Sequence, residues 1–96
     1  MAKTPEVARE IKRRIMVAVW ALAYEVFNVS LVPDSVFDAE AKLIDPKIKT
    51  GREPEDTFFA TEFSPHTGMW VRKHPDIKGL KRVLLIVLEN RRGENT

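Results

Sequence analysis

A short interruption between two helix-forming segments constrains the fold of this chain more than any other feature. Residues 24–44 read YEVFNVSLVPDSVFDAEAKLI. Pro33 fixes its own φ near about −65° and biases Val32 towards extended geometry, so the first helix must stop before it. A second helix then begins at Asp34, where a carboxylate can cap the helix or stabilise its first turn. The pattern predicts a helical hairpin.

The corner of this hairpin gathers aromatic and acidic side chains. Asp34 and Asp38 are four residues apart, so they lie on one face of the second helix, and Phe37 lies beside them. Tyr24 is expected to face them across the corner. Each residue also has a structural explanation. Asp34 is suited to capping, Phe37 to core packing, and Asp38 to an ordinary solvated surface.

This arrangement resembles the N-terminal Ia region of NAD-dependent DNA ligases. That region is a helical hairpin with Tyr-His on the first helix and Pro-Asp-x-x-Tyr-Asp at the start of the second. Tyr24 matches the family tyrosine, the pair Pro33 and Asp34 matches Pro-Asp, and Asp38 matches the second aspartate. The resemblance covers residues 5–46. Short stand-alone chains of this kind occur among phage and bacterial proteins.

Two positions differ from the family pattern. Glu25 stands where the family has His, and Phe37 stands where it has Tyr. The resemblance implies a site for the nicotinamide mononucleotide half of NAD, with Tyr24 and Phe37 stacking on the nicotinamide. Asp34 and Asp38 would accept hydrogen bonds from ribose hydroxyls. Glu25 places a negative charge near an anionic phosphate, and Phe37 lacks the tyrosine hydroxyl, so we expect weak binding or none.

The resemblance does not imply catalysis by this chain. The family's catalytic Lys-x-Asp-Gly motif does not occur in these 96 residues. We therefore expect a protein that is not an enzyme and carries out neither adenylation nor nick sealing.

Composition limits the size and environment of the fold. At 96 residues and 44% hydrophobic content, the chain suits one small domain with a single core. The chain has no cysteine, which fits a cytoplasmic protein and excludes disulfides. The net charge of +2 permits weak contact with nucleic acid.

The remaining periodicity predicts an all-α single domain of three to four helices. The expected elements are a first helix at 4–29, a second at 33–45, a short third at 53–63, a last helix at 77–91 and a frayed tail at 92–96. The run Val83–Leu88 could instead form a buried strand. Helix is favoured because no second strand of similar strength exists to pair with it. Residues Met69–Val71 are expected to be extended or part of a loop.

The first helix should form the centre of the fold. Thr4 and Pro5 suit its start, and the helix is apolar most of the way round from Ile15 onward. Trp20 is expected to be a core residue. The basic trio Lys12–Arg14 is expected to be solvated.

A second function class is an interaction or regulatory protein that uses the hairpin as a scaffold. Its contact surface for an acidic protein or DNA would be basic. The candidate residues are Arg72, Lys73, Lys78, Lys81, Arg82, Arg91 and Arg92. We expect no metal site at His66 or His74, because acidic or thiol partners at ligand spacing are missing. The apolar run at 15–23 is too short to span a membrane.

Overall fold

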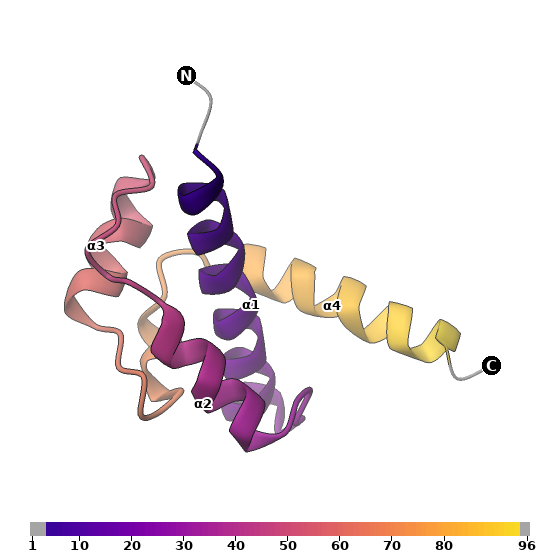
Figure 1. Ribbon diagram of the computed structural model, residues 1–96. Helices are drawn as coiled ribbons and strands as arrows, with labels where there is room; N and C mark the ends of the chain where they lie inside the picture. Colours follow the sequence, from indigo (N-terminus) through magenta and orange to yellow (C-terminus); the bar gives the residue numbers. More distant parts are fainter. Residues whose placement is uncertain (1–3, 95–96) are drawn as a thin grey trace.

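A computed structural model describes residues 4–94, with side chains as far as Arg91. The described chain is helical, without a strand, and forms one compact body (Figure 1). Its elements are α1 (Pro5–Phe27), α2 (Asp34–Leu43), α3 (Glu53–Thr61), the 3-10 helix η1 (Met69–Lys73) and α4 (Ile77–Glu94). The all-α prediction is confirmed. The residues for which a strand was considered lie within α4.

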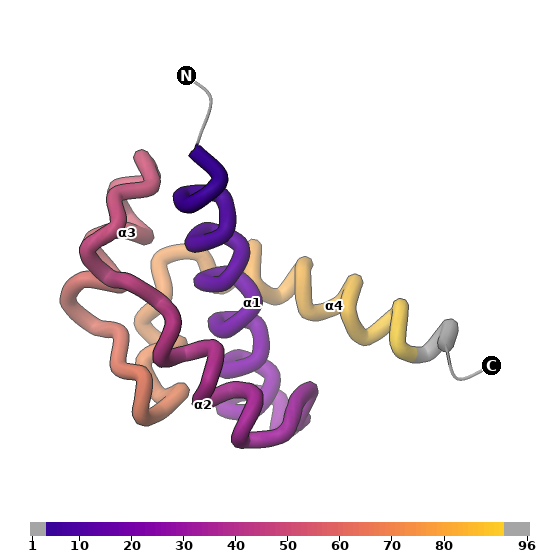
Figure 2. The backbone as a smooth tube through the Cα atoms, in the orientation of Figure 1, coloured from indigo at the N-terminus to yellow at the C-terminus, as the bar shows by residue number. Residues whose placement is uncertain are grey.

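Helix α1 runs through the middle of the molecule and contacts α2, η1 and α4 (Figures 1 and 2). It starts as predicted, because the Thr4 hydroxyl accepts a hydrogen bond from the Val7 N–H at 3.2 Å. It ends at Asn28, whose φ of 58° lies in the left-handed region that terminates helices. Its second half supplies six of the fourteen buried hydrophobic residues of the described chain: Val17, Ala18, Val19, Ala21, Leu22 and Ala23.

Helix α2 begins directly after Pro33 and returns across α1, so the predicted hairpin is present (Figure 1). Asp34 lies in its first turn, but no side-chain capping hydrogen bond is present. The helix ends at Leu43, and Ala41 and Ile44 are its residues in the core. The corner therefore depends on proline geometry and packing rather than on a cap.

An aromatic cluster joins α3 to η1. Phe58 and Phe59 are buried, and the Trp70 ring lies 5.0 Å from Phe63 and 5.7 Å from Phe59 between centroids. Met69–Val71 was predicted to be extended or loop, but these residues form the first part of η1. The short helix turns Trp70 and Val71 inward, where aromatic packing stabilises it.

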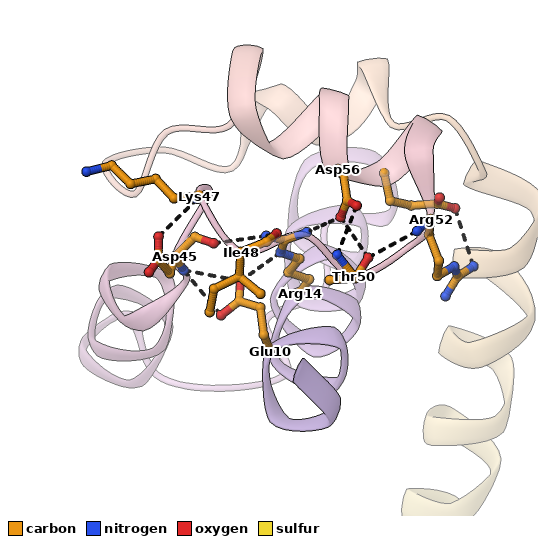
Figure 3. A network of polar contacts seen from close by, with 9 residues as sticks. Glu10, Arg14, Asp45, Lys47, Ile48, Thr50, Arg52 and Asp56 are labelled. Carbon is orange, nitrogen blue, oxygen red and sulfur yellow. Dashed lines mark hydrogen bonds and ion pairs between the residues drawn. The ribbon is translucent and has the colours of Figure 1, made fainter. Parts of the chain in front are cut away.

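The segment between α2 and α3 is held by a buried ionic network centred on Arg14 (Figure 3). Arg14, like Lys12 and Arg13, was predicted to be solvated. For Arg14 this prediction is wrong, because only 3% of its surface is exposed. Its Nε donates to Glu10 at 2.7 Å, and its Nη1 donates to Asp56 at 2.9 Å. The same guanidinium lies over the Phe59 ring.

The other end of the guanidinium binds the loop backbone. Arg14 Nη2 donates to the carbonyl oxygens of Asp45 and Ile48, both at 2.9 Å. Glu10 in turn accepts from the Asp45 N–H, and Asp56 accepts from the N–H and hydroxyl of Thr50. The network therefore fixes a segment that has no regular secondary structure of its own.

Helix α4 packs against α1 near its start and then diverges from the body (Figures 1 and 2). Asp76 caps it, since its carboxylate accepts from the Gly79 N–H at 3.0 Å. Leu80 and Leu84 are buried. The helix continues to Glu94, so part of the predicted tail is helical, and residues 95–96 lie outside the described residues. None of the helices within residues 4–94 has the length and hydropathy of a membrane span.

Candidate functional site

The corner of the hairpin encloses a pocket of about 250 Å³. It lies between the last turns of α1, the corner segment, the start of α2 and the loop before η1. All five residues that the sequence singled out for cofactor binding line it: Tyr24, Glu25, Asp34, Phe37 and Asp38. Residues from two helices, up to 14 positions apart, thus converge on one cavity.

The last turns of α1 supply Tyr24 and Glu25. Tyr24 is 58% exposed, so its ring is free to meet a ligand. Glu25 is half-buried, and its carbonyl oxygen accepts a hydrogen bond from Arg72 Nη2 at 2.7 Å. Arg72 therefore satisfies one of the carbonyl groups at the end of α1, a position where a cation also meets the negative end of the helix dipole.

The first two turns of α2 supply the other three residues. Phe37 is half-buried and packs against the hydrophobic core, which holds its ring in place. Asp34 and Asp38 are exposed, and neither has an ion-pair or hydrogen-bond partner among the described side chains and backbone groups. Both carboxylates can therefore accept hydrogen bonds from a ligand.

The opposite wall contains residues that sequence reasoning did not assign to the site. His66, Thr67 and Gly68 reach the pocket from the loop before η1. Trp20, predicted to be a core residue, is half-buried: it packs against the core and also lines the pocket. Gly68 lies so close to α1 that an added Cβ would be 3.2 Å from the Cβ of Ala21. Nothing local in the sequence indicates which helix this loop will contact.

The loop is also held from the core side. The Trp70 indole N–H donates to the carbonyl oxygen of Thr67, and the Thr67 hydroxyl accepts from the Met69 N–H at 3.1 Å. Trp70 itself belongs to the aromatic cluster and leaves the pocket open. The wall that carries His66 is thus fixed by packing, although His66 is exposed.

A second cavity, of about 210 Å³, lies between α1, α3 and α4. Its walls are largely apolar, and its charged groups already have partners: Arg14 binds Glu10 and Asp56, while Arg52 pairs with Glu55. Burial lowers the pKa of His74 in its wall below 6.5, although nearby carboxylates act in the opposite direction. Few free polar groups remain there to orient a ligand.

The residues of the predicted basic surface come from η1 and α4. Arg72 binds the end of α1, and Lys73 Nζ lies 3.6 Å from the Glu62 carboxylate. Lys78, Lys81 and Arg82 are exposed on α4. Arg91 is exposed near the end of that helix, and the side chain of Arg92 lies outside the described residues.

In the part of the chain that the structure describes, no group of three or more His, Cys, Asp or Glu side chains could hold a metal ion. His66 and His74 belong to different cavities. The chemistry of the hairpin pocket is therefore that of the aromatic side chains of Trp20, Tyr24 and Phe37, three carboxylates and one imidazole.

Comparison of the chain with protein-family models, with curated proteins and with solved structures gives no match.

Proposed function

We propose that this chain is a non-catalytic module, similar to the ligase Ia region, that weakly binds the nicotinamide mononucleotide half of NAD. The observation that supports the proposal is the convergence of Tyr24, Glu25, Asp34, Phe37 and Asp38 on one pocket. All five positions follow from the resemblance in sequence. On the same resemblance, the chain is of phage or bacterial type and acts in the cytoplasm.

The pocket chemistry suits the nicotinamide and the ribose of this ligand. Tyr24 and Phe37 offer aromatic faces to the nicotinamide ring, and Asp34 and Asp38 offer acceptors to the ribose hydroxyls. The volume of about 250 Å³ is below the roughly 300–1,000 Å³ of pockets that enclose drug-sized ligands. The phosphate would therefore remain near the rim.

The charge near the rim limits affinity. Glu25 replaces the family histidine and repels a phosphate, while His66 supplies an imidazole from the opposite wall of the same pocket. This imidazole comes from the loop before η1, whereas the family histidine lies on the first helix of the hairpin. We expect binding in the high micromolar to millimolar range.

Calorimetric titration with nicotinamide mononucleotide tests this proposal. Asp38→Ala should weaken binding about tenfold, because losing a hydrogen bond to a charged acceptor costs about 1.4 kcal/mol of binding free energy. Its melting temperature should stay unchanged. Glu53→Ala is the matched control, since it removes one exposed carboxylate from α3, outside the pocket, and should leave affinity unchanged.

Restoring the family residue provides the opposite change. Glu25→His removes a negative charge at the rim and should strengthen binding. If neither the wild type nor Glu25→His binds at millimolar concentration, the nucleotide proposal is wrong.

The second candidate function is a scaffold for a protein partner or for DNA. It is favoured by the exposure of Lys78, Lys81 and Arg82 on α4, which leaves three cations on one helix. Filter binding of nicked and intact duplex at two salt concentrations tests the DNA form of this function. Retention that does not fall with salt would exclude an electrostatic interface.

A further inference from the structure

Helix α4 is apolar on two opposite faces, although only one of them packs against the body. Leu80 and Leu84 are buried against the rest of the fold. Leu85 and Ile86, which follow directly, are 61% and 58% exposed. At 3.6 residues per turn, these two side chains point away from the buried pair. Contiguous exposed apolar side chains are candidates for an interaction surface, whereas scattered single ones are normal on any protein.

Charged residues of opposite sign flank this exposed pair. Arg82, Leu85, Ile86 and Glu89 follow the spacing i, i+3, i+4, i+7, so all four lie along one stripe of α4. Arg82 and Glu89 are both exposed, and neither forms an ion pair with another described residue. We call these four residues the outer stripe. Helix α4 diverges from the body here, and Figure 1 shows no other element covering this part of it.

We propose that the outer stripe is the interface with a second copy of this chain, packed antiparallel about a two-fold axis between Leu85 and Ile86. In this register Leu85 meets Ile86 of the other copy. Arg82 is three residues before Leu85, and Glu89 is three residues after Ile86, so each Arg82 meets the other copy's Glu89. The stripe is thus self-complementary in charge as well as in apolar character, which an isologous interface requires.

The same features disfavour other occupants. A nucleic acid would meet two aliphatic side chains in the middle of its contact and the carboxylate of Glu89 at one end. A second copy instead places apolar residues on apolar residues and opposite charges together. The stripe is short compared with standard interfaces of about 800 Å² per partner, so the dimer is weak and depends on concentration.

Sedimentation equilibrium of the full chain, from micromolar to millimolar concentration, tests the dimer and its register. The wild type should pass from one copy to two. Arg82→Glu and Glu89→Arg should each stay monomeric, because each places like charges together at both ends of the stripe. An equimolar mixture of the two variants should dimerise. In the mixed pair the two substituted side chains face each other with opposite charges at one end, and the unchanged Arg82 and Glu89 meet at the other.

Matched apolar variants separate the stripe from general surface hydrophobicity. Leu85→Asp should abolish dimerisation, whereas Leu43→Asp on α2, where Leu43 is 56% exposed, should leave it unchanged. Circular dichroism should show unchanged helix content for each variant. A wild type that stays monomeric at millimolar concentration would overturn the proposal, and so would a monomer that binds DNA or lipid vesicles through Leu85. A mixture of Arg82→Glu and Glu89→Arg that stays monomeric would overturn the register.

Discussion

Arg14 shows how one buried cation can replace secondary structure in a small fold. Burying a charge without partners is strongly unfavourable, but each partner of Arg14 is already in place: two carboxylates and two loop carbonyl groups. The buried carboxylate of Asp56 likewise has its partners in place. Burial acts to raise its pKa, yet hydrogen bonds from Thr50 and Arg14 outweigh burial and lower the pKa below 3.8. The residues between α2 and α3 take their conformation from this network.

Replacing Arg14 should therefore strongly destabilise the protein. Arg14→Met keeps an apolar stem but leaves Glu10 and Asp56 buried without their cation, which should cost about 3–5 kcal/mol of unfolding free energy. Arg13→Ala is the control, because the Arg13–Glu40 pair is partly exposed and should contribute less than about 1 kcal/mol. Urea denaturation measures both. Equal losses for the two variants would show that the network does not stabilise the fold.

Two helix starts should respond differently to loss of their polar side chain. Thr4→Ala removes the hydrogen bond to the Val7 N–H and should cost about 1 kcal/mol. Asp34→Ala removes no capping bond and only loses the favourable interaction with the helix dipole, about 0.3–1 kcal/mol. Thermal unfolding of the two variants, compared with Ser35→Ala on the same turn as Asp34, should show this order. A larger loss for Asp34→Ala would mean that the carboxylate caps α2 in solution.

Local signals were sufficient to predict the helical elements. Thr4 and Pro5, Pro33, and the apolar stripe of α4 each act on neighbouring residues, so the sequence reveals them directly. The ends of the helices differ from the predicted bounds by a few residues, which is where side-chain patterns carry the least information. Only the short η1 was assigned to the wrong kind of structure, because its conformation depends on where Trp70 is buried.

Only the residues that the hairpin contributes to the candidate pocket could be predicted from the sequence, for a related reason. Tyr24, Asp34 and Asp38 belong to one hairpin, whose geometry follows from the corner. His66 and Gly68 reach the same pocket from more than 25 residues further along the chain, and no local pattern specifies that approach. The burial of Arg14 was missed likewise, because its partner Asp56 is 42 residues away.

The substitution Gly79→Ala tests whether the cap of α4 contributes more to stability than the higher helix propensity of alanine. Gly→Ala within a helix usually stabilises it by about 1 kcal/mol. At Gly79, however, the added Cβ would collide with the capping carboxylate of Asp76, so Gly79→Ala should be neutral or destabilising. In an Asp76→Ala background the same substitution should stabilise. A double-mutant cycle by urea denaturation measures the difference, and purely additive effects would show that the collision is relieved without loss of the cap.

At the scale of the whole molecule, long-range contacts make the fold cooperative. Glu10 and Arg14 join α1 to residues 31–42 positions away, and Arg72 joins η1 to the end of α1 across 47 positions. Helices α2 and α3 cannot separate from α1 without exposing this network. We therefore expect the amide groups of Asp45 and Thr50, which donate to Glu10 and Asp56, to exchange with solvent only when the whole domain unfolds.

Acid should weaken the whole fold in two steps. The pKa of His74 is lowered by burial, so the unfolded chain takes up a proton more readily and stability falls as the pH drops through about 6.5. Protonation would also remove the acceptor that His74 Nδ1 offers to the Asp76 N–H. The pKa of Asp56 is lowered too, so its contribution is present above 3.8 and is lost at more acidic pH.

Melting curves between about pH 7.5 and 5.5 isolate the first step. His74→Asn keeps an acceptor but cannot titrate, so its melting temperature should change less than that of the wild type. His66→Asn alters an exposed histidine and should behave like the wild type. The interpretation fails if His74→Asn remains as sensitive to acid as the wild type.

The two tryptophans provide separate optical reporters. Trp20 lines the hairpin pocket, whereas Trp70 is 5% exposed and surrounded by phenylalanines. A nicotinamide ring stacked near Trp20 should quench its fluorescence while leaving Trp70 emission at the short wavelengths of a buried indole. Trp70→Phe would leave one emitter at the site, and Trp20→Phe would leave one in the core. Ligand occupancy and core integrity can thus be followed by emission from the natural side chains, without an attached dye.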